Sequence, residues 1–212
     1  MARCTKEDAL ATRHRLLDAA ERVFAEKGVS RTSLNDIALA AGATRGAIYW
    51  HFKNKGDLFN AMMERTTLPM ETALYDIGYD PLRDPLEQMV STFLSAMHEI
   101  VTNERTRCVF EVATFKVEYV DELLAVKERQ LHIQAEMMKA MERSLQQACA
   151  VRGQPLTIPI DTVTRGLSAL ICGLIENWLM NPQAFDLQEV ARVTLDVFLG
   201  GLGLTVRRAC FP

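Results

Sequence analysis

The sequence lacks the features that mark several large classes of protein. Its five cysteines among 212 residues (Cys4, Cys108, Cys149, Cys172 and Cys210) are odd in number and widely spaced, with no Cys-x-x-Cys pair. This spacing excludes a disulfide framework and favours a reducing, cytoplasmic setting. No run of eighteen apolar residues occurs, and the chain does not open on a basic segment followed by an apolar one. We therefore expect neither a membrane span nor a secretory leader.

Motifs of the common enzyme classes are also missing. There is no Gly-x-Ser-x-Gly, no P-loop and no Glu-x-x-His pair of the kind found in di-iron bundles. The glycines from Gly200 to Gly203 follow an apolar helical segment rather than a strand, so they do not form a phosphate-binding loop. Glu128, His132 and Glu136 are spaced four residues apart and could hold a metal. No second segment offers matching ligands, and we interpret them as a solvated helix face. The sequence thus predicts no catalytic residue, no cofactor and no metal.

Charge is distributed unevenly along the chain. Residues 1–60 carry ten Lys or Arg against seven Asp or Glu, whereas the remainder carries fourteen against twenty. An acidic bulk opposes non-specific coating of nucleic acid. A weakly basic N-terminal part therefore suits a protein that contacts nucleic acid through one localised face.

The segment from Thr32 to Lys55 predicts two short helices joined by a tight turn. Ser33 and Asp36 form a capping-box pattern, and the apolar residues that follow share one helical face. Gly42 is placed to end this helix, and Thr44 is placed to cap a second one that starts at about Arg45. This is the arrangement of a helix-turn-helix, in which the N-terminal residues of the second helix enter the major groove of DNA.

The second helix leaves several side chains free to touch DNA once Ile48 and Phe52 pack back on the first. Arg45 can reach base edges, the small Gly46 allows close approach, and Lys55 is expected to be a mobile charge that meets a phosphate. The predicted DNA-contacting residues are Thr32, Ser33, Thr44, Arg45, Gly46, Ala47, Tyr49, His51 and Lys55.

The rest of the chain predicts an all-α fold of about nine helices. The first helix should run from Thr5 to Lys27, and a fourth should start after Asn54, with a kink or break at Pro69. Residues 85–151 keep a 3.6-residue apolar period in two or three segments, with a break around Asn103. The last two helices are expected at about residues 160–180 and 187–204.

The run from Thr5 to Leu58 resembles the DNA-binding domain of the TetR family. Residues 44–55 (Thr-Arg-Gly-Ala-Ile-Tyr-Trp-His-Phe-Lys-Asn-Lys) are similar to its recognition helix and the entry to its fourth helix, and the start of the chain is similar to the AcrR/TtgR-like branch of multidrug efflux repressors. The resemblance implies a DNA-binding domain over residues 1–53 and a ligand-binding and dimerisation domain over 54–212. Gly56 departs from the family pattern, where a polar or acidic helix former is common, and could loosen the start of the fourth helix.

The same resemblance implies an apolar effector cavity in the second domain. Methionine adapts to varied apolar ligands, and a few polar groups orient them. The candidate ligand residues are Met62, Met63, Met97, Phe110, Glu111, Thr114, Phe115, Met138, Asn177 and Trp178. Phe110 and Thr114 fall where this branch tends to carry polar residues, so Phe110 makes the site more apolar there. Taken singly, each residue is more typical of an ordinary core.

The last two helices have the pattern of a dimer interface. Two glycines seven residues apart let another helix approach closely, and the final helix is apolar nearly all round, which indicates burial on more than one side. In the TetR family these helices pair with their symmetry mates. The predicted dimerisation residues are Gly166, Leu170, Gly173, Val193, Val197 and Phe198.

Together these features predict a cytoplasmic, homodimeric repressor that binds a palindromic double-stranded operator, controls a multidrug efflux operon and is released by a hydrophobic small molecule. Three alternatives remain: a regulator of a metabolic or quorum-sensing operon, a repressor that responds to thiol oxidation, and an enzyme whose N-terminal part merely resembles a DNA-binding domain.

Overall fold

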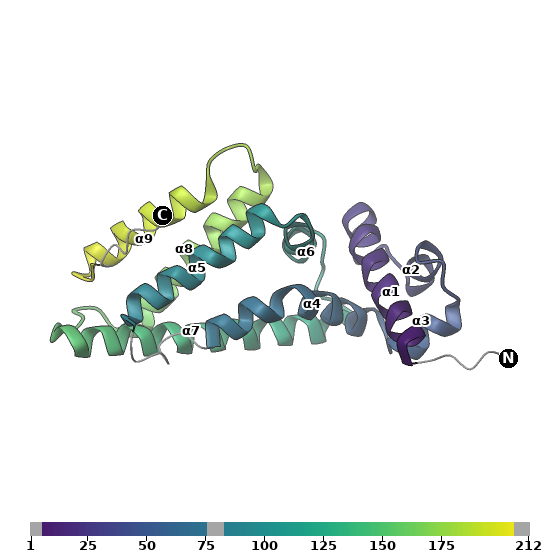
Figure 1. Ribbon diagram of the computed structural model, residues 1–212, viewed down its shortest axis with the longest axis horizontal. Coiled ribbons are helices and arrows are strands. Elements are labelled where there is room, and N and C mark those ends of the chain that lie inside the picture. The colour runs from purple at the N-terminus through teal and green to yellow at the C-terminus, as the bar shows by residue number, and fades with distance from the viewer. Residues whose placement is uncertain (1–5, 76–82, 206–212) are drawn as a thin grey trace. The chain divides into compact units, whose positions relative to one another are not determined.

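The computed structural model describes residues 6–75 and 83–205, and within these ranges the chain is helical with short connections and no strand (Figure 1). The helices are α1 (Lys6–Lys27), α2 (Leu34–Ala40), α3 (Arg45–His51), α4 (Lys55–Tyr75), α5 (Pro85–Thr102), α6 (Glu104–Phe115), the 3-10 helix η1 (Asp121–Leu123), α7 (Leu124–Arg152), α8 (Ile160–Met180) and α9 (Leu187–Gly201). The predicted all-α fold of about nine helices is confirmed. No helix in the described ranges is both long and apolar enough to cross a membrane.

Most helix limits agree with the sequence pattern because local signals set them. α1 ends at Lys27, where Gly28 takes a φ of 80° that other residues rarely adopt. Asp84 caps α5, and Pro85 occupies its first turn, where a proline is tolerated. Thr5, the predicted start of α1, lies outside the described residues.

Three predicted limits are wrong. α4 does not break at Pro69 but continues to Tyr75. A proline removes a single backbone donor, at about 3 kcal/mol, and the hydrogen bonds on either side of it hold the helix. The apolar period predicts helix throughout residues 85–151, but residues 116–120 are not helical and separate α6 from η1. α9 ends at Gly201, three residues before the predicted limit, and Gly203 takes a φ of 76°.

The chain divides into two compact units, and each is described by itself. The first unit contains the chain up to Leu68 together with Arg105–Leu131, and the second contains Pro69–Glu104 together with the chain from His132 onward. In the first unit, α6, η1 and the start of α7 pack with the helix-turn-helix. The domain boundary expected between residues 53 and 54 stays a prediction.

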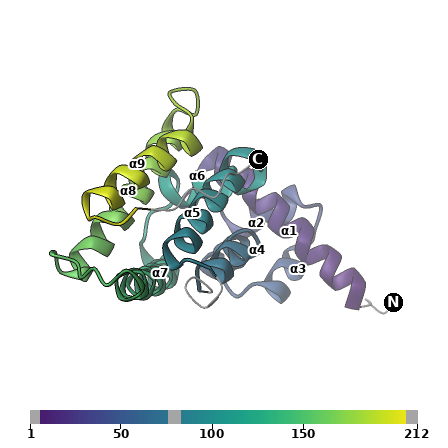
Figure 2. The ribbon, with the colours of Figure 1, turned by 60° about the vertical axis from the view of Figure 1, so that its left-hand side comes forward.

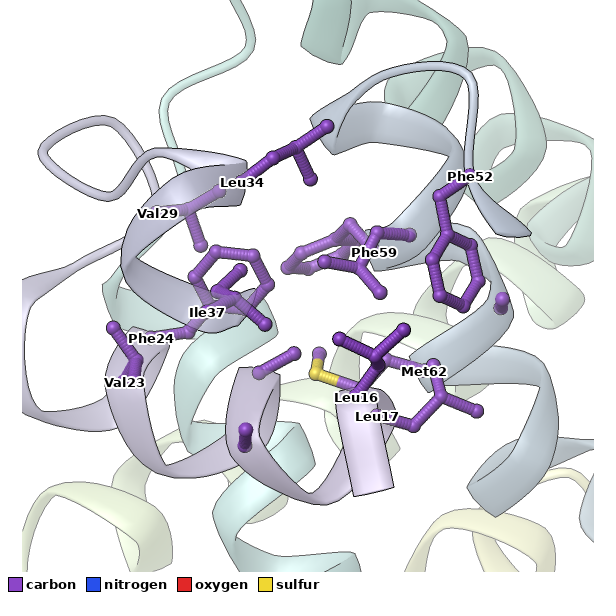
Figure 3. Close-up of a cluster of buried hydrophobic side chains, with 14 of the residues drawn as sticks. Leu16, Leu17, Val23, Phe24, Val29, Leu34, Ile37, Phe52, Phe59 and Met62 are labelled. Carbon is purple, nitrogen blue, oxygen red and sulfur yellow. The ribbon is translucent and has the colours of Figure 1, made fainter. Parts of the chain in front are cut away.

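The core of the first unit joins α1, α2 and α3 to the start of α4. Leu16, Phe24, Ile37, Phe59 and Met62 are almost fully buried and point toward one another (Figure 3). Val109 and Val112 of α6 and Leu123 and Val126 beyond it belong to the same cluster. Burial of a large apolar side chain contributes about 1.5–3 kcal/mol, so these contacts dominate the stability of the unit.

Salt bridges connect α1 to α4 and to α6 in the same unit. Glu21 is 7% exposed and pairs with Arg65 of α4, while Arg105 of α6 lies 3.3 Å from its other carboxylate oxygen. Asp18 accepts from both arginines, at 2.9 Å and 2.8 Å. A buried carboxylate is tolerated when its charge is compensated in this way.

The second unit is built on α5, α8 and α9. α8 and α9 lie side by side, and α5 packs against α9 (Figures 1 and 2). Its core contains Leu86, Met89, Phe93, Met97, Ile100, Met141, Leu145, Leu167, Ile171, Leu195 and Leu199. Asp84, the cap of α5, also accepts from Arg152 at the end of α7, with 3.0 Å between the two side chains. This contact joins the start of α5 to the end of α7 within the second unit.

Candidate nucleic-acid interface

The helix-turn-helix is held by the caps that its sequence predicts. The Ser33 hydroxyl accepts from the Asp36 N–H at 3.2 Å, and the Asp36 carboxylate accepts from the Ser33 N–H at 2.9 Å. The Ser33 hydroxyl also donates to the Asp36 carboxylate at 2.7 Å, and the hydrogen bonds that this carboxylate accepts from the Ser33 hydroxyl and N–H lower the pKa of Asp36 below its ordinary value. Gly42 takes a φ of 62° in the turn, and the Thr44 hydroxyl accepts from the Ala47 N–H at 3.1 Å. Both caps and the turn glycine are confirmed.

Burial of one face of α3 decides which of its side chains meet solvent. Ile48 is fully buried and Phe52, which follows the helix, is 2% exposed. Arg13 of α1 places its guanidinium 5.3 Å from the centre of the Phe52 ring. α1 and α2 both pack against α3, so the opposite face of α3 is the surface that can enter a groove.

The exposed face of α3 carries the predicted base-reading residues. Thr44, Arg45, Gly46 and Tyr49 are exposed, and Ala47 is half-buried. The Arg45 guanidinium lies 5.7 Å from the centre of the Tyr49 ring, a cation–π geometry that holds these two exposed side chains together. The five residues therefore form one continuous strip that a DNA groove could accept.

Trp50 is a surface residue to which the sequence patterns assigned no role. It is 73% exposed on α3, with its ring edge-on to His51 at 4.5 Å. The signal was available, because burial of Ile48 and Phe52 places residue 50 on the opposite side of a helix with 3.6 residues per turn. A large exposed aromatic here extends the strip and can contact sugar or phosphate.

His51 is half-buried at the end of α3, beside the exposed strip. Burial, with a smaller effect from the charge of Arg13, lowers the pKa of His51 below its ordinary value of 6.5. At neutral pH the ring is therefore uncharged in the free protein and acts as a hydrogen-bonding group rather than as a cation.

The structure places two predicted DNA contacts differently. Thr32 is 2% exposed, and its hydroxyl donates to the Gly28 carbonyl at 2.8 Å, so its side chain faces the protein. Lys55 is not a mobile charge: its side chain is 12% exposed, and its ammonium donates to the carbonyls of Ser30 and Thr32 at 3.3 Å and 3.1 Å. Both corrections arise from the turn before α2, which folds over these groups.

A polar groove of about 500 Å³ lies beside α3 in the first unit. It is lined by the turn from Ser30 to Leu34, by Tyr49, by the segment from Lys53 to Lys55 and by Glu122 of η1. Arg31 and Lys53 are exposed there, and within the described residues neither side chain forms a salt bridge. The groove thus presents positive charge next to the strip of α3.

The predicted ligand residues are divided between the two units. Met62 is fully buried in the core of the first unit, where it packs as an ordinary core residue, and Met63 lies against that core. Phe110, Glu111 and Thr114 of α6 are half-buried, and Phe115 is exposed. In the second unit Met97 and Trp178 are buried, Met138 is half-buried, and the exposed Asn177 donates to the Gly173 carbonyl at 2.7 Å. None of the ten lines the groove beside α3.

The predicted dimer residues include one contact that lies within the chain. A Cβ on Gly166 would lie 3.4 Å from the ring of Phe198, so this glycine allows α9 of the same chain to approach α8. Among the described residues, a Cβ on Gly173 would have no atom within 4 Å apart from its chain neighbours and the backbone of its own helix. Leu170 is half-buried, and Val193 and Val197 are 44% and 69% exposed on α9. An apolar surface is therefore open along these two helices.

Metal and thiol chemistry receive no support from the described residues. No group of three or more metal-binding side chains gathers among them, and the series Glu128, His132 and Glu136 does not form a site. Cys172 is half-buried and burial raises its pKa, which disfavours the reactive thiolate. Cys4 and Cys210 lie outside the described residues.

Comparison with known proteins places the whole chain among bacterial regulators. Residues 16–62 match the family described as bacterial regulatory proteins, tetR family, and residues 84–203 match the C-terminal region of MAATS-type transcriptional repressors. The transcriptional regulator AcrR of Shigella flexneri is 37% identical over 203 residues, which cover 94% of this chain and 93% of AcrR.

Solved structures agree with this placement. NalD, the secondary repressor of the MexAB-OprM multidrug efflux pump in Pseudomonas aeruginosa, superposes with a TM-score of 0.84 at 36% identity and covers 92% of this chain and 98% of its own. A complex of SmeT with triclosan has a TM-score of 0.79 at 31% identity and covers 95% of each chain. SmeT is the repressor of the SmeDEF multidrug efflux pump of Stenotrophomonas maltophilia.

Proposed function

Because the chain belongs to the TetR family of bacterial regulatory proteins, we propose that it is a homodimeric repressor that binds a palindromic operator and releases it when a hydrophobic small molecule binds. The observation that carries the proposal is the strip of α3, whose Arg45 and Tyr49 face solvent because Ile48 and Phe52 are buried. Such a protein acts in the cytoplasm, where the operator lies.

The proposed DNA contacts follow from the exposure of each residue. Arg45 stands at the N-terminus of α3 and has the planar fork that reads G O6 and N7. Ser33, Thr44 and Tyr49 are exposed, and we assign to them the contacts that position the helix on the DNA backbone. Two heads related by a two-fold axis would read half-sites about 34–36 Å apart, which accounts for a palindrome.

The proposed operon encodes a multidrug efflux pump, as it does for NalD and SmeT. Support for a hydrophobic small-molecule effector comes from the SmeT complex with triclosan. Met62 no longer belongs to the proposed effector residues, because it packs in the core of the first unit. A metabolic effector would leave the DNA-binding argument unchanged.

The proposed dimer uses the apolar surface along α8 and α9. Val193 and Val197 remain exposed on a helix whose other apolar residues are buried or half-buried. Two exposed valines one helical turn apart, together with the half-buried Leu170 and the small Gly173 of α8, fit an interface with another subunit.

The test begins with the intergenic DNA beside the gene, searched for a palindrome. Fluorescence anisotropy then measures binding of the purified protein to this duplex and to a scrambled one, with and without a panel of apolar compounds. The matched variants are Arg45→Ala on α3 and Arg22→Ala on the exposed side of α1. Arg45→Ala should weaken the operator complex by about 1–3 kcal/mol per half-site and the scrambled complex much less. Arg22→Ala should preserve the preference. A protein that binds both duplexes equally would refute the proposal.

A further inference from the structure

The groove beside α3 contains one negative charge among its cations. The carboxylate of Glu122 lines it together with Arg31, Lys53 and Lys55. Glu122 belongs to η1, far along the chain from the helix-turn-helix, yet it lies in the same compact unit. Its side chain is 41% exposed, so the carboxylate stands at the surface of the groove rather than beneath it.

Glu122 engages the start of α4 in two ways. Its Oε2 atom accepts from the backbone N–H of Lys55 at 3.1 Å, and its Oε1 atom lies 3.7 Å from the Lys55 ammonium. The first N–H groups of a helix have no partner within the helix and carry its positive end. One carboxylate therefore compensates both the helix terminus and the lysine.

These two groups are the ones that a phosphate would use. A helix N-terminus with a nearby lysine is a general anion-binding arrangement, because backbone N–H groups and a cation meet the same oxygens. Arg31 and Lys53 extend the positive charge along the groove. A DNA phosphate that enters beside α3 thus meets a cation whose charge Glu122 already compensates.

We propose that Glu122 is an internal counter-anion that weakens the binding of DNA phosphates at this groove. The inference rests on the proposed DNA-binding function and concerns sequence-independent affinity. Glu122 acts through Lys55: while the pair is closed, Lys55 adds little to the attraction for DNA. Together with the Ser30 and Thr32 carbonyls, this pairing keeps Lys55 from acting as a free phosphate ligand.

The experiment uses the unsubstituted protein and four variants, of which Lys55→Gln is the fourth. Glu122→Gln keeps the size of the side chain and an oxygen that accepts from the Lys55 N–H, but it removes the charge. Glu118→Gln removes an exposed carboxylate from the same connection outside the groove, and is the control. The double variant Glu122→Gln with Lys55→Gln removes both charges of the pair. Affinity for the operator and a scrambled duplex is measured by fluorescence anisotropy over a salt series.

Glu122→Gln should bind both duplexes more tightly and by the same factor. Two uncompensated lysines per dimer should make the slope of log K against log salt steeper by about 1.8. The ratio of its association constant to that of the unsubstituted protein should then fall about tenfold between about 50 and 200 mM salt. The double variant should return to the original slope, and Glu118→Gln should leave it unchanged.

Other results overturn the inference. If Glu122→Gln binds no more tightly, or has the slope of Glu118→Gln, Glu122 is only a structural cap. Lys55→Gln alone tests the pair from the other side: it should weaken both duplexes, since it leaves Glu122 uncompensated, and unchanged binding would contradict the proposal. If the unsubstituted protein binds neither duplex, the proposed function fails and the inference fails with it. Binding of the operator with no effect of Glu122→Gln refutes the inference alone.

Discussion

Gly56 should be intolerant of alanine although it lies in a helix. It is the second residue of α4, and a Cβ built on it would lie closer than 3.0 Å to the carbonyl oxygen of Glu122, a separation that real Cβ atoms essentially never show. That oxygen is backbone, so relief requires a shift of η1. Overpacking of this kind costs about 1–3 kcal/mol. The gain in helix propensity from glycine to alanine, at most about 1 kcal/mol, offsets only part of it.

We therefore expect Gly56→Ala to lower the free energy of unfolding by about 1–2 kcal/mol and Tm by about 2–8 °C. Gly46→Ala is the matched control, because Gly46 is the second residue of α3 and its nearest neighbour to such a Cβ is the Thr44 hydroxyl at 3.9 Å. It should be neutral or slightly stabilising. Thermal unfolding at one fixed protein concentration measures both, since Tm of a dimer depends on concentration. If Gly56→Ala is as stable as Gly46→Ala, the Glu122 carbonyl does not approach residue 56 closely enough to exclude a side chain.

Three further perturbations test other parts of the molecule. At Gly173 an added Cβ would meet no described atom within 4 Å apart from its chain neighbours and the backbone of α8, so Gly173→Leu should leave the monomer fold intact but disrupt the proposed dimer. Sedimentation velocity should then show monomer, and a dimer would place the interface elsewhere. Because the pKa of His51 is lowered by burial and by Arg13, the unfolded chain takes up this proton first as pH falls, and stability should decline below about pH 6.5. His51→Gln should remove that part of the decline in urea unfolding, and an unchanged pH profile would contradict the assignment. Glu21→Gln leaves Arg65 with one carboxylate instead of two and should destabilise the protein by about 1–3 kcal/mol in the same assay, whereas a neutral effect would show that Asp18 alone suffices.

Interactions between near neighbours in the chain could be predicted from the sequence. Residue type and spacing determine the capping box of Ser33 and Asp36 and the cap at Thr44, because each hydrogen bond joins residues three positions apart. The left-handed conformation of Gly42 depends on that residue type alone. Burial of Ile48 and Phe52 follows from the 3.6-residue period in the same way. The side of α3 that faces DNA was therefore predictable, although Trp50 on it was missed.

Only the tertiary structure decided the roles of residues whose partners lie far along the chain. The sequence suggested that Gly56 loosens the start of α4, whereas in the structure its missing side chain makes room for the carbonyl of Glu122. The sequence also suggested that Lys55 is a free cation, whereas its ammonium donates to the carbonyls of Ser30 and Thr32. Gly166 likewise meets Phe198 of its own chain. Periodicity shows which face of a helix is buried, but not what covers it. The covering atoms come from segments brought together by the burial of the whole apolar core, and no local pattern encodes which backbone oxygen arrives at which residue.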